Sequence, residues 1–210
     1  MARKRQLVDI SEFIGQNTSD FKVDNKIMKT IDQTFRHMVD KHNMDRIVAY
    51  HFEYRYPEDY QLEDDGKNEH FRRTQGSSMK HLTRKECSPH YVAVREQKDN
   101  EKHPHYHVLL FGDERNFPES HCIAQTTDVF LSSALGYEET QNGLVHNCSK
   151  GNQKHVIKIN SPDSIAQIDS LYKHGAYFAK ADQKDYNNGT RELFSSNLNH
   201  EQKKKKRKSK

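Results

Sequence analysis

The chain has 210 residues, which suits a single domain with some additional segments and is too short for two full-sized domains. Hydrophobic residues make up 32% and charged residues 30% of the chain, and the mean hydropathy of −1.11 predicts a thin core under a heavily charged surface. The formal net charge is +4 and no apolar run approaches the ~20 residues of a membrane span, so we expect a soluble, cytoplasmic protein with no membrane partner.

The first predicted elements are a helix and a strand. Between residues 24 and 41, apolar residues recur at intervals of three and four, which predicts an amphipathic helix packed on a sheet. Residues 46–55 are rich in β-branched and aromatic residues and end before Pro57, which predicts a central strand. Its residues His51, Glu53 and Arg55 share one face. That face either borders a metal site or meets water, and we favour water.

A loop, a helix and a hairpin are predicted next. Residues 59–69 are acidic and polar and read as a loop, and residues 71–86 form a basic helix that meets either phosphates or solvent. A strand over residues 91–97 is followed by a polar turn and a second strand that begins near His105. So short a connection predicts an antiparallel pair.

The second strand of this hairpin carries the most informative pattern in the chain, the run His103-Pro104-His105-Tyr106-His107 ahead of an aliphatic segment. Alternate residues of a strand share a face, so His105 and His107 project together while the intervening residues pack into the layer behind. Two adjacent imidazoles indicate a divalent metal ion; the alternative is polar residues at the entrance of a strand. Glu96, at the end of the preceding strand, is the predicted third ligand, and the alternative is a surface glutamate near a turn.

The remaining predicted elements complete the fold class. Residues 118–135 form a helix closed by Gly136, short strands follow at 143–146 and 155–160, and a last helix runs over residues 161–180. This mixture predicts an α+β fold, in which helices pack on a central antiparallel sheet.

Two residues of the last predicted helix carry side-chain groups that could take part in a reaction. Tyr177 and Lys180 are three residues apart, so they share a helix face on which a phenol and an ammonium group can reach the same phosphate.

The cysteines and the C-terminal region carry less specific signals. Cys87, Cys122 and Cys148 are odd in number and widely spaced, which suits reduced thiols and provides no complete set of four zinc ligands. From residue 182 the chain is polar, and it ends in a basic run that we expect to be disordered and to bind nucleic acid; the alternative is a solubilising tail. The DNA-binding residues of that run are Lys203, Lys204, Lys205, Lys206, Arg207 and Lys208.

With these motifs in view, three segments resemble the filamentous-phage (inovirus) type of rolling-circle replication initiator, within the paired-histidine (HUH) endonuclease superfamily. The segments are Val94-Arg95-Glu96-Gln97, the histidine strand over residues 103–110, and Tyr177-Phe178-Ala179-Lys180-Ala181-Asp182. The resemblance implies an N-terminal extension over residues 1–23, an endonuclease domain over 24–185, and a polar linker with the basic tail over 186–210. It also implies a sheet of the ferredoxin-like palm type, with the metal on its open face.

The resemblance further implies a role for each residue of the site. His105 and His107 would be metal ligands with Glu96 as the third, Tyr177 the nucleophile and Lys180 its assistant. Ala181 stands where some relatives have a second tyrosine, and Tyr172 is a fallback nucleophile. The cofactor would be Mg²⁺ or Mn²⁺. The partners would be single-stranded or supercoiled origin DNA, together with the helicase and polymerase of a bacterial host.

The implied chemistry is the nicking and rejoining of one DNA strand. A phenol is mostly neutral at physiological pH, and a divalent cation assists its attack by polarising the scissile phosphate. Attack forms a 5′-phosphotyrosine ester and releases a 3′-hydroxyl that a polymerase can extend. Because the ester retains the bond, the strand can be rejoined without a nucleotide cofactor.

Two other functions remain open from the sequence. His103, His105 and His107 alternate as in the histidine-triad nucleotide hydrolases, which need no metal, so chelators would separate the two enzyme classes. A DNA-binding or regulatory protein could also keep the fold without cutting DNA.

Overall fold

The computed structural model describes residues 23–62, 68–97, 102–149, 154–179 and 192–198. The helices are α2 (Asn25–Lys41), α3 (Glu69–Arg84), α4 (Ser120–Ala134) and α5 (Ser164–Phe178). The strands are β1 (Arg46–Tyr54), β2 (His90–Glu96), β3 (His105–Asp113), β4 (Val145–Asn147), β5 (His155–Lys158) and β6 (Leu193–Ser195).

These strands form one antiparallel sheet in the order β4-β1-β3-β2-β6, and β5 also pairs with β1. The succession β1-α3-β2-β3-α4-β4 in this order is the βαββαβ arrangement of the ferredoxin-like fold. The predicted fold class is therefore confirmed, and so is the central place of β1.

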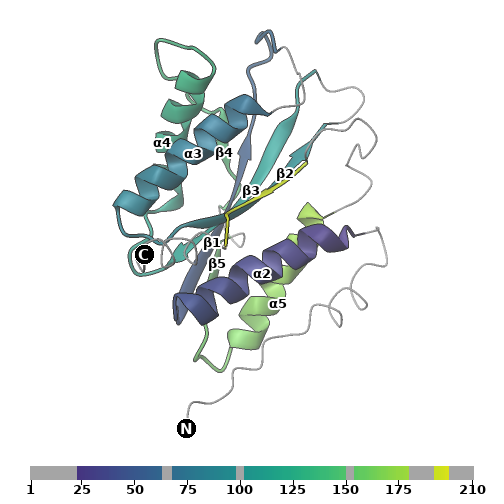
Figure 1. Cartoon of the computed structure of the whole chain (residues 1–210), viewed down its shortest axis with the longest axis vertical. Helices are drawn as coiled ribbons and strands as arrows, with labels where there is room; N and C mark the ends of the chain where they lie inside the picture. Colours follow the sequence, from purple (N-terminus) through teal and green to yellow (C-terminus); the bar gives the residue numbers. More distant parts are fainter. Residues whose placement is uncertain (1–22, 63–67, 98–101, 150–153, 180–191, 199–210) are drawn as a thin grey trace, which may run out of the picture.

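Helices cover both faces of the sheet, with α3 and α4 on one side and α2 and α5 on the other (Figure 1). Alternate residues of each strand point to opposite faces of the sheet. Tyr50, Phe52 and Val108 pack in the cluster under α3 and α4, whereas Leu109 and Phe111 pack under α2 and α5. Two apolar layers, one on each face of the sheet, therefore form the core.

Helix α2 shows how the sequence determines one of these covering elements. The side chain of Asp24 caps its first turn by accepting hydrogen bonds from the backbone N–H groups of Lys26 (2.7 Å) and Ile27 (3.3 Å). Its apolar stripe is buried, as predicted. A β-carbon on Gly175 of α5 would lie 3.1 Å from Ile31 Cδ1, so the glycine permits the close approach of the two helices.

Strand β6 extends the sheet beyond residue 185, the predicted end of the folded domain. It pairs with β2, and Phe194 is buried against Phe71 of α3. A strand of three residues is too short to be recognised from an alternation of apolar and polar residues, so the sequence predicted only a linker here.

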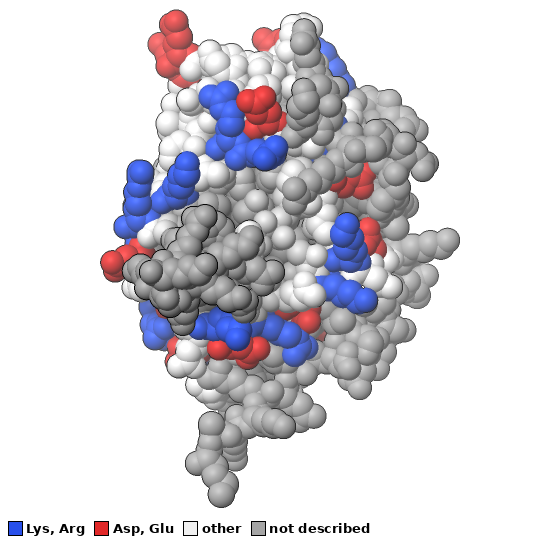
Figure 2. Space-filling model, in the orientation of Figure 1, with Lys and Arg blue, Asp and Glu red and all other residues white. Residues whose placement is uncertain are grey.

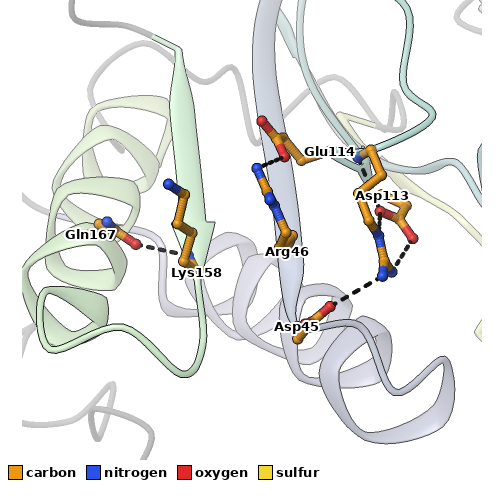
Figure 3. A network of polar contacts seen from close by, with 7 residues as sticks. Asp45, Arg46, Asp113, Glu114, Lys158 and Gln167 are labelled. Carbon is orange, nitrogen blue, oxygen red and sulfur yellow. Dashed lines mark hydrogen bonds and ion pairs between the residues drawn. The ribbon is translucent and has the colours of Figure 1, made fainter.

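Polar contacts link the ends of β1, β3 and β5 to neighbouring segments (Figure 3). Arg46 pairs with Glu114 at 2.6 Å, joining the start of β1 to the residue after β3, and Lys158 N–H donates to Gln167 of α5 at 2.8 Å. Basic and acidic side chains are interspersed on the face shown in Figure 2. No helix in the described part of the chain has the length and apolarity needed to cross a membrane.

Candidate metal centre

The paired histidines lie at the start of β3 with the orientation that alternation predicted. The ring centroids of His105 and His107 are 5.1 Å apart, and both side chains are less than one-fifth exposed. Tyr106 between them is buried in the opposite layer, with its ring stacked on Phe71. The two imidazoles therefore share the sheet face that α2 and α5 cover further along the strands.

Glu96 stands directly beside this pair. It is opposite His105 in the β2–β3 ladder and is 5% exposed. Its Oε2 lies 3.2 Å from Nε2 of His107 and 3.7 Å from Nε2 of His105. The carboxylate predicted as a third ligand is thus within reach of an ion held by both imidazoles.

A second carboxylate, Glu53 of β1, joins the same group. It is opposite His107 in the β1–β3 ladder, and its Oε1 lies 3.8 Å from Nε2 of His105. Ligand atoms of Glu53, His105 and His107 all lie within 4.8 Å of one another, close enough to hold one metal ion. Mixed imidazole and carboxylate donors suit a divalent cation.

The prediction that His51 and Glu53 face water is therefore wrong. The two residues are 6% and 7% exposed, because neighbouring strands and α5 enclose this part of β1. Polar residues at every second position of a strand usually face solvent, which is why the sequence suggested water.

The charge of Glu53 is set by opposing effects. Burial acts to raise its pKa, but the hydrogen bond from Arg55 at 2.8 Å and the nearby charges of His107 and Arg55 outweigh burial and leave the pKa below its ordinary value. Glu53 is therefore ionised near neutral pH, the state in which a carboxylate binds a cation.

A row of histidines stands behind the candidate ligands. Nδ1 of His107 is 3.1 Å from Nε2 of His51, Nδ1 of His51 is 3.2 Å from Nε2 of His174, and Nδ1 of His174 is 2.8 Å from Nε2 of His155. If each Nδ1–H donates to the next ring, Nε2 of His107 carries no proton and can bind a metal.

Burial favours the neutral form of His51, His174 and His155. It is the main cause that lowers the pKa of His51 to about 2, with the charges of His107 and His174 adding to it. The pKa of His174 falls to about 4, chiefly through burial and then through His155 and His107. Neutral rings can each donate one hydrogen bond and accept another, as the row requires.

The candidate nucleophile Tyr177 lies beside this centre. It is 52% exposed in the last turn of α5, three residues after His174. A cavity of about 730 Å³ brings it together with two of the candidate ligands; its lining is His51, Glu53, Arg55, His107, His146, Asn147, Cys148, His155, Ser170, His174 and Tyr177.

The remaining residues considered for the site from the sequence lie away from the candidate metal centre or outside the described residues. Tyr172 is completely buried and its hydroxyl donates to Asp32 at 2.6 Å, so it is a core residue and cannot serve as the fallback nucleophile. His103 precedes β3 and packs against Tyr56, which belongs to the layer under α3 and α4. Lys180 and the basic run over residues 203–208 lie outside the described residues.

The cysteines are free thiols, as predicted. Cys87 is buried and its Sγ contacts the backbone carbonyl of Asn116 at 3.3 Å, within the cluster under α3 and α4. His90, three residues later, has the same strand parity as Val92 and Val94, which pack on the opposite face. The two residues therefore do not form a zinc half-site.

A family model described as the YagK/YfjJ C-terminal domain matches residues 12–196. No curated protein and no solved structure matches the chain.

Proposed function

The chain belongs to the YagK/YfjJ C-terminal domain family, a family of prophage-like proteins, and from this premise we propose that it is a metal-dependent single-strand DNA endonuclease with Tyr177 as nucleophile. The observation that carries the proposal is the shared cavity. An exposed phenol and two candidate metal ligands, His107 and Glu53, line one hollow in the surface. A phosphodiester in that hollow could meet an ion and a nucleophile together.

The ligands and their support match what phosphoryl transfer requires. His105 and His107, with Glu53 or Glu96, would hold Mg²⁺ or Mn²⁺, and imidazole donors tilt the preference towards Mn²⁺. When bound, the ion would supply polarisation of the scissile phosphate and offset the charge of the transition state. His51 would keep His107 in the tautomer that presents Nε2.

In the proposed step, the phenolic oxygen of Tyr177 forms a bond to phosphorus while the bond from phosphorus to the 3′-oxygen breaks. The phenol loses its proton to solvent and the departing 3′-oxygen gains one. The products are a 5′-phosphotyrosine ester and a free 3′-hydroxyl, and the reverse reaction rejoins the strand. Arg55, whose side chain is 62% exposed at the cavity, would attract the adjoining phosphates.

We extend the proposal to the initiation of rolling-circle replication of a phage or prophage-like element, in the manner of the inovirus-type paired-histidine initiators. The paired histidines on a central strand and the membership of a prophage-like family support this finer assignment. Origin DNA would be the substrate, and a host helicase and polymerase the partners that use the 3′-hydroxyl.

The histidine-triad alternative receives less support. It needs His103 beside the other two histidines, whereas His103 packs against Tyr56 on the other side of the sheet. A hydrolase of that class would also keep its activity in the presence of a chelator.

The test is to trap the covalent intermediate. The protein is incubated with end-labelled single-stranded DNA of random sequence and Mn²⁺, and adducts that survive denaturing electrophoresis are mapped by mass spectrometry. We expect an adduct on Tyr177 that disappears with chelator and in Tyr177→Phe. Tyr137→Phe is the matched control, because Tyr137 packs against Tyr60 away from the cavity lining, and it should react normally.

Two outcomes would overturn the proposal. An adduct that persists in Tyr177→Phe would remove Tyr177 as nucleophile. If the wild-type protein bound the labelled DNA in the presence of Mn²⁺ but formed no covalent adduct, the function of a non-cleaving DNA-binding protein would be favoured.

A further inference from the structure

A second cluster of imidazoles lies at the other end of β2 from the candidate metal centre. His90 begins β2 and Glu96 ends it, so the two clusters are separated by about 20 Å at ~3.3 Å per residue. Both lie on the same sheet face, because His90 and Glu96 have the same parity as the buried Val92 and Val94. The apolar layer under α2 and α5 fills the space between them.

The cluster consists of His37, His42 and His90. Their ring centroids are 5.0–5.2 Å apart, and Nε2 of His90 is 3.2 Å from Nε2 of His42. One nitrogen from each of the three lies within 4.8 Å of the others. All three side chains are only partly exposed, so the cluster is set into the surface.

The chain reversal after α2 makes this geometry possible. His37 and His42 are five residues apart, which on a continuous helix would place them on different faces. The helix ends at Lys41, Asn43 adopts a left-handed conformation with φ 49°, and Met44 N–H donates to the Met38 carbonyl at 3.2 Å. This turn brings His42 against His37, and packing of α2 on the sheet brings both to His90.

Three imidazoles so close together repel one another when they are protonated. Neutral imidazole is the form that binds a metal. A ligand set of imidazoles alone, without a carboxylate, suits zinc and its neighbours in the first transition series and suits Mg²⁺ poorly.

We propose that His37, His42 and His90 bind one Zn²⁺ ion, or a transition-metal ion of the same class, with solvent as a fourth ligand. Such an ion would join the C-terminal end of α2 to the first residue of β2 and so fasten the α2 layer to the sheet. The site is independent of the proposed nuclease function, since it shares no residue with the candidate metal centre. Its ligand chemistry also differs, so the two sites would select different metals.

Co²⁺ is the probe of choice, because it absorbs strongly in the visible range when its coordination is tetrahedral. The double variant His105→Gln/His107→Gln removes two ligands of the candidate metal centre and serves as the background. In this background we expect one equivalent of Co²⁺ with tetrahedral absorption, which Zn²⁺ displaces. Zn²⁺ at 100 times its dissociation constant should raise the Tm by about 5 to 10 °C.

Adding His37→Gln or His42→Gln to the background should abolish both the absorption and the Tm increase. Both positions are partly exposed, and far-UV circular dichroism verifies that each variant folds. His81→Gln on α3 is the matched control and should bind Co²⁺ normally. The proposal is overturned if the background variant binds no Co²⁺, if its absorption is of the weak octahedral type, or if the folded His37→Gln and His42→Gln variants retain the signal.

Discussion

Nδ1 of His107 lies 3.1 Å from Nε2 of His51, while Nε2 of His107 lies 3.2 Å from Glu96. One ring nitrogen is thus held by a neighbouring strand, and the other faces the carboxylates. The tautomer and orientation of a metal-binding imidazole are commonly fixed by such a partner on its second nitrogen.

His51→Leu should therefore weaken Mn²⁺ binding without removing a ligand. Loss of an outer partner typically costs roughly 10–100-fold in affinity, and we expect a loss in that range. Mn²⁺ titration followed by electron paramagnetic resonance measures it. His51→Gln, which keeps a hydrogen-bonding group, should recover part of the affinity. Equal Mn²⁺ affinity in His51→Leu and the wild type would show that His51 does not position His107.

The two carboxylates at the centre should both contribute to Mn²⁺ binding. Glu53→Gln and Glu96→Gln keep the shape of each side chain and remove its charge. Each should weaken binding by at least roughly tenfold, and the double variant should show no binding at millimolar Mn²⁺. Glu114→Gln, which alters the ion pair with Arg46 after β3, is the matched control. Wild-type affinity in Glu96→Gln would exclude Glu96 from the ligand set.

Acidification should destabilise the metal-free protein through its buried histidines. The pKa of His174 is about 4 in the folded protein against an ordinary value of 6.5, so the unfolded chain binds more protons between these two pH values. Stability is thus present above about pH 6.5 and is lost as the pH falls towards 4. From pH 7 to pH 5, His174 should account for about 2 kcal/mol of this loss, at ~1.4 kcal/mol per pKa unit.

Urea unfolding at pH 7 and pH 5, with chelator present, measures this effect. The difference in unfolding free energy between the two pH values should be smaller in His174→Gln than in the wild type. His121→Gln, at an exposed position at the start of α4, should leave the difference unchanged. The explanation fails if both variants show the same acid sensitivity.

Tyr172→Phe should lower stability and leave strand cleavage intact. The variant loses the 2.6 Å hydrogen bond to Asp32, and a hydrogen bond to a charged group contributes about 1.5–3 kcal/mol. Asp32 keeps its ion pair with Arg36 at 2.7 Å, so the loss of stability should fall at the lower end of this range. Chemical denaturation measures the change, and the covalent DNA adduct should still form. An adduct that is lost while the variant remains folded would reopen the case for Tyr172.

The alternation of side chains along β3 and the apolar stripe of α2 could be predicted because both follow from local backbone geometry. Side chains two residues apart in a strand share a face, so the pairing of His105 with His107 is contained in the segment itself. Glu96 was predictable because a short hairpin places it opposite His105.

The tertiary structure alone decided the rest of the site. β1 lies beside β3 although α3 and β2 intervene in the chain, and this strand order brings Glu53 and His51 to His107. α5 then adds Tyr177 to the same cavity from more than sixty residues away. Local propensity carries no information on which distant strands become neighbours, since that choice depends on how two apolar layers are buried together. For the same reason His37, His42 and His90, which form no motif in the sequence, meet only because α2 packs on the sheet.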